Sequence, residues 1–105
     1  PFVQPTGVTP HVLTFALEQN VPNPFNPVTT IRYNIAAPGA EVDLAVFDLS
    51  GRRLRTLVHR HRGPRSWSTQ WNGENESGVQ VASGVYFYRL RAGTLVETRK
   101  MVLLK

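Results

Sequence analysis

Cysteine is absent from the sequence, so neither a disulfide framework nor a metal site built on thiolates is available to it. No apolar run approaches the roughly 18 residues of a membrane-spanning helix, and no segment has the features of a signal peptide. Helical periodicity and helix caps are also missing. The chain begins with Pro1 rather than methionine, and we expect it to be the C-terminal part of a longer protein.

Motifs that carry chemistry are missing as well. There is no nucleophile elbow, no phosphate-binding glycine loop and no pair of carboxylates in a catalytic setting. His59 and His61 are two residues apart, and His11 is distant, so the histidines do not have the spacing of a metal site. We therefore expect a protein that is not an enzyme and that binds no cofactor and no small-molecule substrate.

The residues that are present indicate one globular domain. A chain of 105 residues, 41% of them hydrophobic and 18% charged, can form a single core. The net charge is +5, from ten arginines and two lysines. Basic proteins often bind nucleic acid or anionic surfaces. Here the arginines are scattered over several segments, which favours a solvated surface and argues against nucleic acid as a partner.

Short apolar segments separated by turns predict an all-β protein. Residues 1–12 contain three prolines and little periodicity, so we expect a linker from an upstream domain there and a folded domain over residues 13–105. Residues 42–49 are apolar on both faces, which predicts a central strand covered at least partly on each side. Residues 59–64 are expected to be a polar loop. Strands are predicted at residues 13–18, 29–36, 42–49, 53–58, 66–71, 85–91 and 95–104. About seven antiparallel strands in two sheets fit an immunoglobulin-like β-sandwich.

Two groups of residues suggest either a structural or a functional role. Trp67 and Trp71 lie on one face of a predicted strand, where large aromatic residues belong to a core more often than to a sugar-stacking platform. Oxygens that a Ca²⁺ ion could bind occur together in one loop, although the Asp-rich ladder of a calcium hand is missing, so a solvated turn is favoured. The loop residues are Asn72, Glu74, Asn75 and Glu76.

Other motif residues have simpler structural explanations. Prolines in the segment Asn23-Pro24-Phe25-Asn26-Pro27 remove backbone donors, which excludes a central strand and predicts a fixed corner with Phe25 closing one end of the core. Tyr86, at the start of a strongly alternating segment, is expected to form a tyrosine corner through its hydroxyl. Gly51, beside Ser50, and Gly84, beside Ser83, are expected in turns.

Taken in order, these motifs resemble a known family over nearly all of residues 17–105. The matching segments are Asn23-Pro24-Phe25-Asn26-Pro27, Thr29-Thr30-Ile31-Arg32-Tyr33, Val46-Phe47-Asp48, Gly51-Arg52, Leu57-Val58, Trp71-Asn72-Gly73, Gly78, Ala82 to Leu90, and Thr98 to Lys105. They resemble the C-terminal sorting domains of the bacterial type IX secretion system. Asn72 departs from the aspartate usual in the family, but either residue can make the same side-chain-to-backbone turn. A sister family, the immunoglobulin-like domain of flagellar hook-capping proteins, shares much of the pattern.

The resemblance implies a signal that rides on a secreted cargo in Bacteroidetes-type bacteria. The cargo would cross the outer membrane from the periplasm to the cell surface or medium, and the domain would then be removed or exchanged for a surface anchor. The partners implied are the outer-membrane secretion machinery and an upstream cargo domain in the same chain. The machinery is expected to read the final strand, residues Thr98, Arg99, Lys100, Met101, Val102, Leu103, Leu104 and Lys105.

The final segment has physical features that suit such a role. Val102, Leu103 and Leu104 form an apolar run bracketed by Arg99, Lys100 and Lys105. A last strand at a sheet edge could pair with a strand of a receptor. Three alternatives stay open: a passive structural spacer, a carbohydrate-binding sandwich beside a hydrolase, and a flagellar hook-cap domain.

Overall fold

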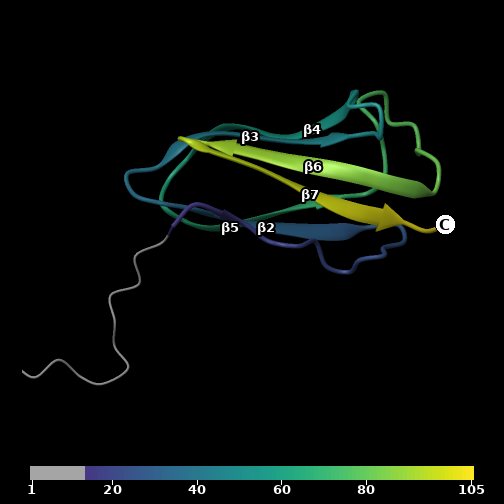
Figure 1. Cartoon of the computed structure of the whole chain (residues 1–105), viewed down its shortest axis with the longest axis horizontal. Coiled ribbons are helices and arrows are strands. Elements are labelled where there is room, and N and C mark those ends of the chain that lie inside the picture. Colours follow the sequence, from purple (N-terminus) through teal and green to yellow (C-terminus); the bar gives the residue numbers. More distant parts are fainter. Residues whose placement is uncertain (1–13) are drawn as a thin grey trace, which may run out of the picture.

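The computed structural model describes residues 14–105 as a sandwich of two antiparallel sheets. The three-stranded sheet has the order β1-β2-β5 and the four-stranded sheet the order β4-β3-β6-β7 (Figure 1). No helix within residues 14–105 is long and apolar enough to cross a membrane. The strands are β1 (Ala16–Leu17), β2 (Thr29–Ile35), β3 (Ala40–Phe47), β4 (Arg53–Arg62), β5 (Arg65–Trp71), β6 (Gly84–Ala92) and β7 (Leu95–Leu103).

The place of β4 distinguishes this sandwich from the seven-stranded constant-type arrangement. In that arrangement the fourth strand belongs to the first sheet, whereas here β4 pairs with β3 in the second sheet. A short turn joins β3 to β4, so the two strands pair as a hairpin. Asp48 accepts hydrogen bonds at Oδ1 from the backbone N–H groups of Ser50 and Arg52, and Gly51 has φ of 84°, which favours glycine.

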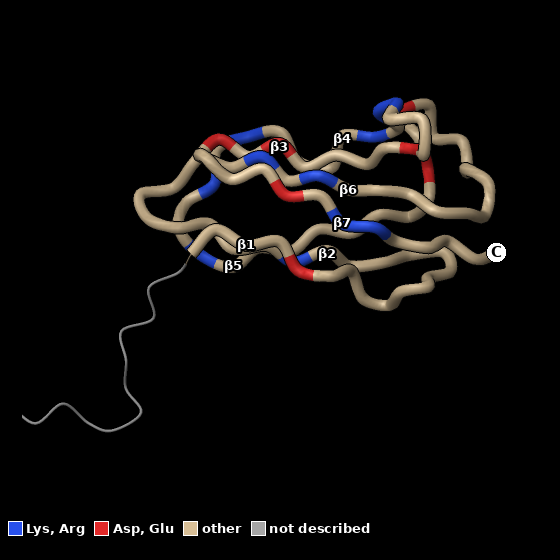
Figure 2. Tube along the Cα trace, in the orientation of Figure 1, with Lys and Arg blue, Asp and Glu red and all other residues tan. Residues whose placement is uncertain are grey.

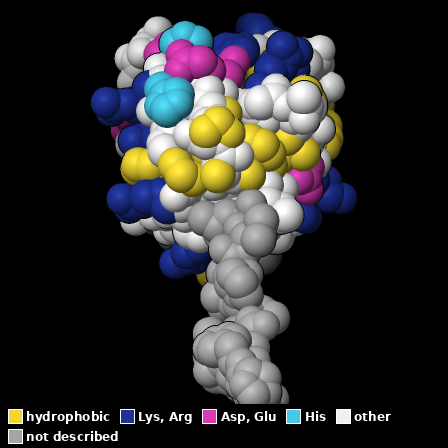
Figure 3. Space-filling model, turned by 90° about the vertical axis from the view of Figure 1, so that its left-hand side faces the viewer, with side chains coloured by type: hydrophobic (Ala, Val, Ile, Leu, Met, Phe, Trp, Pro, Cys, Tyr) yellow, Lys and Arg dark blue, Asp and Glu magenta, His cyan; other side chains and the backbone are white. Residues whose placement is uncertain are grey.

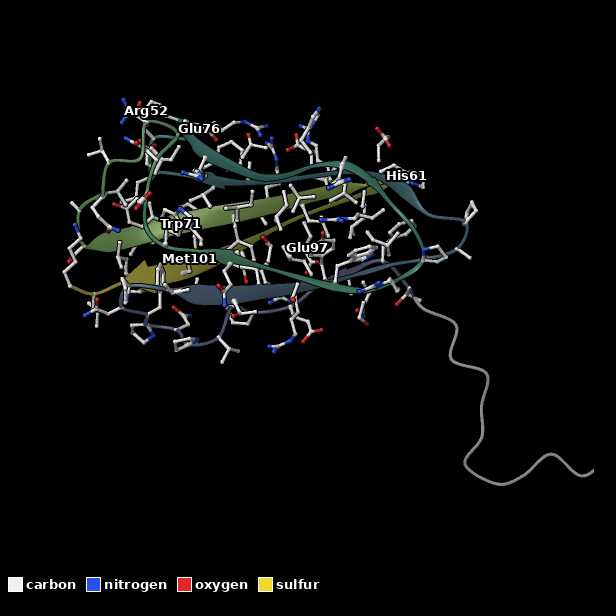
Figure 4. The ribbon with its side chains drawn as sticks, turned by 180° about the vertical axis from the view of Figure 1, so that it is seen from behind. Arg52, His61, Trp71, Glu76, Glu97 and Met101 are labelled. Atoms are coloured by element: carbon white, nitrogen blue, oxygen red, sulfur yellow. The ribbon has the colours of Figure 1, made fainter. Side chains whose placement is uncertain are left out.

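The core is built from the inward faces of both sheets. Strands β2, β3 and β6 each place alternate side chains between the sheets, as a period of two requires. Trp71 is 1% exposed. Its ring centroid lies 5.7 Å from that of Phe25 and 5.5 Å from that of Tyr86. Trp71 and Met101 extend into the space between the sheets (Figure 4).

Most predicted strands are present, and the differences are informative. The predicted polar loop at residues 59–64 is wrong, because β4 continues to Arg62 as an edge strand whose ladder to β3 needs no apolar side chains. The central position predicted for residues 42–49 is confirmed for β3, but Leu49 lies beyond the strand and is 71% exposed. The first strand is only Ala16–Leu17. The predicted linker over residues 1–12 lies outside the described residues.

The described chain enters the sandwich at one end, and Lys105 lies at the other (Figure 1). Hydrophobic side chains gather on the entry end, with lysine and arginine side chains at its rim (Figure 3). Phe15 packs close to the backbone there, since a Cβ atom added to Gly93 would lie 3.1 Å from its ring. The upstream chain and the final residues are therefore separated by the length of the strands.

Replacing Trp71 with alanine should lower the free energy of unfolding by about 3–5 kcal/mol, because it leaves a large cavity between the sheets. Urea denaturation followed by circular dichroism measures this change. Trp67→Ala, at a half-buried position of the same strand, is the matched control and should cost clearly less. Equal losses for the two variants would contradict the assignment of Trp71 to the centre of the core.

Candidate functional site

The terminal strand β7 lies at the edge of the four-stranded sheet and pairs along its whole length with β6. Its side chains divide between the two faces. Met101 and Leu103 are fully buried in the core, whereas Lys100 and Lys105 are exposed and Leu104 is 53% exposed. The expected signal residues therefore include core side chains as well as surface side chains.

The outer edge of β7 is closed near its end by residues 23–25, which we call the 23–25 clasp. The Val102 N–H donates to Oδ1 of Asn23 at 2.9 Å, and the Val102 carbonyl accepts from the Phe25 N–H at 2.9 Å. The Leu104 N–H donates to the Phe25 carbonyl at 3.0 Å. The proline-rich corner is thus a hydrogen-bonding partner of the terminal strand, and the Phe25 ring also fills the core, as predicted.

Polar contacts close the seam between β1 and β7, where the two sheets meet. Arg99 donates from Nε to the Leu17 carbonyl at 2.7 Å, and Gln19 donates from Nε2 to the Lys100 carbonyl at 2.8 Å. The Tyr88 hydroxyl donates to the Glu18 carbonyl at 2.7 Å. Burial raises the pKa of Tyr88 to about 12, so the hydroxyl remains a donor at neutral pH. Arg99 therefore joins the sheets in addition to pairing with Glu97 at 3.2 Å.

Among the described residues, backbone hydrogen bonds along the outer edge of β7 are found at its end and not at its start. In an antiparallel ladder alternate residues direct their N–H and C=O groups away from the paired strand, and the contacts of Val102 identify the even-numbered residues as these. Within residues 14–105, no hydrogen bond is found for the outward backbone groups of Val96 and Thr98. The backbone edge at residues 102–104 is therefore occupied by the 23–25 clasp.

The loop with the suggested calcium ligands uses its oxygens internally. Oδ1 of Asn75 accepts from the N–H groups of Ser77 and Val79, and Oδ1 of Asn72 accepts from the Glu74 N–H. These bonds describe a self-closed turn. The described residues 14–105 contain no group of three or more histidine, aspartate or glutamate side chains placed to hold a metal ion.

The same loop covers the edge of β4. The Glu76 N–H donates to the Leu54 carbonyl at 2.9 Å, and Oε1 of Glu76 accepts from the Thr56 N–H at 2.5 Å. Arg52 and Glu76 lie at the end of the sandwich where Trp71 and Met101 are also seen (Figure 4). Both outer edges of the four-stranded sheet are therefore covered at the end where the chain finishes.

The suggested sugar-stacking platform is wrong, because its two rings are not free. Trp71 is buried in the core. The guanidinium carbons of Arg62 and Arg65 lie 4.2 Å and 4.1 Å from the centroid of the Trp67 ring, and the Trp67 indole N–H donates to the Gly63 carbonyl at 3.0 Å. A sugar could not stack on a pair of rings arranged in this way.

The motif residues gather around the end of β7. Gly84 pairs with Leu103 and Tyr86 pairs with Met101, and the Tyr86 hydroxyl donates to the Ala82 carbonyl, as expected of a tyrosine corner. A Cβ atom on Gly73, whose φ is 79°, would lie 3.4 Å from Cδ2 of Leu103. Gly78 lies farther off, in the loop that covers β4. Gly73, Gly84 and Tyr86 therefore belong to the packing environment of the last strand.

Residues 21–104 match the family described as the secretion system C-terminal sorting domain. The chain belongs to this family, the C-terminal sorting domains of type IX secretion. Membership indicates a sorting role rather than a catalytic one, and export to the cell surface or out of the cell. A comparison with curated proteins found no match.

Two solved structures resemble this sorting domain in fold. Dimeric latent PorU from Porphyromonas gingivalis is 21% identical, with a TM-score of 0.67 over 93% of this chain. PorZ, described as an essential bacterial surface component of the type IX secretion system of P. gingivalis, is 22% identical, with a TM-score of 0.56 over 87% of this chain. The alignments cover only 10% of the PorU chain and 11% of the PorZ chain, so they show the fold alone.

Replacing Asn23 with alanine should weaken the clasp without unfolding the sorting domain. Losing the acceptor of the Val102 N–H should lower the free energy of unfolding by about 1 kcal/mol and increase amide exchange at Val102 about fivefold. Hydrogen exchange measured by NMR tests both. Asn26→Ala is the control, because Asn26 is exposed and its side chain makes no hydrogen bond within residues 14–105. Similar exchange at Val102 in both variants would contradict the clasp.

The Asp48 turn should make stability depend on pH. A hydrogen bond from Ser50, together with the Arg52 amide and guanidinium, holds the pKa of Asp48 below its usual 3.8. A lowered pKa contributes stability above the unfolded value, and that contribution is lost as pH falls through the folded value. In thermal melting, the wild-type domain should therefore have a higher melting temperature than the Asp48→Asn variant at neutral pH. This difference in melting temperature should shrink below about pH 4. A difference that stays constant down to pH about 2.5 would contradict this.

Proposed function

We propose that this domain is a non-catalytic C-terminal signal, and that the cargo protein attached to it crosses the outer membrane through the type IX system. The cargo is an upstream domain of the same chain, and it passes from the periplasm to the cell surface or the medium. The recognised part is the exposed portion of the terminal strand and the residues that follow it. Family membership over residues 21–104 supports this role.

The observation that carries the proposal is the separation of the two chain ends. The described chain enters at one end of the sandwich, and Lys105 lies at the opposite end (Figure 1). A cargo joined at the entry end would therefore leave the final residues free to contact a receptor.

The division of side chains along β7 indicates which residues are read. Met101 and Leu103 are 0% exposed, so they support folding and are hidden from a receptor. The 23–25 clasp occupies the backbone edge near Val102. The remaining contact groups are the side chains of Lys100, Leu104 and Lys105, which offer two cations beside one apolar group. We infer recognition of this end through side chains.

The partner we propose is a protein of the outer-membrane secretion machinery, and attachment to the cell surface after transport is a further part of the proposal. Nucleic acids and small-molecule substrates have no place in it. Domains of the same fold occur in PorU and PorZ, which are much longer chains. This supports a common secretion context and does not identify the receptor.

The test is secretion of a reporter that carries a secretory signal peptide and ends in this chain, expressed in a host with a type IX system. Deleting residues 100–105 is a poor test, because it removes the core side chains of Met101 and Leu103. The double substitution Leu104→Ser with Lys105→Gln changes surface groups only. It should reduce secretion about tenfold, which corresponds to a loss of about 1.4 kcal/mol in the free energy of binding to the receptor.

The matched control is Val79→Ser with Arg60→Gln, which changes one exposed apolar residue and one exposed cation away from β7. Its secretion should stay within about twofold of wild type, since isolated surface substitutions are nearly neutral. Thermal melting of both purified variants establishes that they fold. Normal secretion of a folded Leu104→Ser, Lys105→Gln variant would overturn the proposed recognition site.

A further inference from the structure

The outer face of the four-stranded sheet has a shallow apolar hollow that Leu104 and Lys105 do not line. It has a volume of about 310 Å³, and Phe47, Leu49 and Phe87 form its apolar part. A second hollow of about 310 Å³ lies on the other side of Leu49 and reaches Val85. Because Leu49 and Asp48 line both hollows, the two form one strip across the end of β3.

Two guanidinium groups flank the ring of Phe47. The Arg89 Cζ atom lies 4.5 Å from the ring centroid and the Arg53 Cζ atom lies 5.2 Å from it. Arg53 is paired with Asp43, through N–O distances of 3.1 Å and 3.2 Å. Within residues 14–105, Arg89 has no hydrogen bond or ion pair of its own, although it is half-buried and lines the hollow. Its guanidinium stacks on the ring of Phe47 and lies within the electrostatic influence of Asp43.

The acidic residues near the hollow are already neutralised. Asp43 accepts both N–H groups of Arg53. Asp48 is paired with Arg52 at 3.3 Å and accepts the donors of its own turn. Lysine and arginine residues occur along the strands of this sheet (Figure 2), whereas the strands of the other sheet contain only Arg32 and Arg65. The hollow is therefore left with uncompensated positive charge.

The surroundings of Arg89 disfavour its charge. Burial is the main cause, and the neighbouring charges of Arg91 and Arg53 add to it, so the pKa of Arg89 lies below its usual value. The guanidinium remains charged at neutral pH. A carboxylate bound beside it would replace like-charge repulsion with a charge-assisted hydrogen bond, which is stronger than a neutral one.

We propose that this hollow binds an acidic, extended peptide segment of a partner protein, with a carboxylate on Arg89 and an adjacent apolar side chain over Phe47 and Phe87. The open, elongated strip favours a peptide, because sites for small molecules enclose most of their ligand. Lys100, on the strand beside Phe87, adds a second cation for a further acidic residue. This site shares Lys100 with the proposed signal but includes neither Leu104 nor Lys105, and it does not depend on their being the export signal.

The test is an NMR titration of the full 105-residue chain with a blocked hexapeptide of alternating glutamate and leucine. Two matched peptides carry glutamine or lysine in place of glutamate. We expect the glutamate peptide to shift the amide signals of Phe47, Phe87, Arg89 and Thr98, and to bind at least about tenfold more tightly than either matched peptide. Binding should weaken as salt is raised, because the charges at the surface are screened.

Arg89→Gln should weaken binding of the glutamate peptide about tenfold, and Leu49→Ser, at an exposed position that folding does not need, about fivefold. Arg60→Gln is the control. Arg60 is exposed on β4 opposite the inward-facing Val42, so it lies on the other side of the sheet, and its loss should change affinity by less than about twofold.

The proposal is overturned if the glutamine peptide binds as tightly as the glutamate peptide, or if the shifts map to another surface. It is also overturned if none of the peptides binds, or if a folded Arg89→Gln variant binds normally. Since Leu49→Ser is a surface substitution, it tests the apolar half of the site even if Arg89→Gln fails to fold. Because the measurements use purified protein, their outcome is independent of secretion.

Discussion

The hydrogen bonds between the 23–25 clasp and the end of β7 are the contacts on which the organisation of this domain depends. They join residues 79 positions apart in the sequence and occupy the backbone groups of Val102 that would otherwise face solvent. The end of the terminal strand is consequently covered. Phe25, Tyr86 and Gly84 all lie against this covered end. The family motif is therefore best understood as the surroundings of one strand.

The sequence predicted the strands better than it predicted how they are covered. The alternation in Ile31, Tyr33 and Ile35 defines β2, because burial on one face imposes a period of two. The end of β4 was missed because an edge strand can continue with polar side chains such as His59 and His61. Among the proposed signal residues, buried and exposed side chains alternate along the strand. The run Val102-Leu103-Leu104 does not reveal this alternation in the sequence, because all three residues are apolar.

The hydrogen bonds of the 23–25 clasp could not be predicted from a single sequence. The prolines of residues 23–27 correctly excluded a central strand there and predicted a corner. Nothing in the local sequence identifies Val102 as the hydrogen-bonding partner of this corner. Long-range pairing of this kind depends on how the sheets are stacked. The same is true of Arg89. Its position over Phe47 results from the register of β3 and β6, in which Ala45 and not Phe47 lies directly opposite it.

The positions of the two chain ends bear on how the domain would respond to mechanical load. Tension applied between the upstream chain and a receptor holding Lys105 would run parallel to the strands (Figure 1). Hydrogen bonds of the β1–β2 and β6–β7 ladders lie across that direction, so several would have to break together. Only two residues of β1 take part on the upstream side, against nine in β7. Under traction the upstream strand should therefore peel away first, while the tail stays anchored in its sheet.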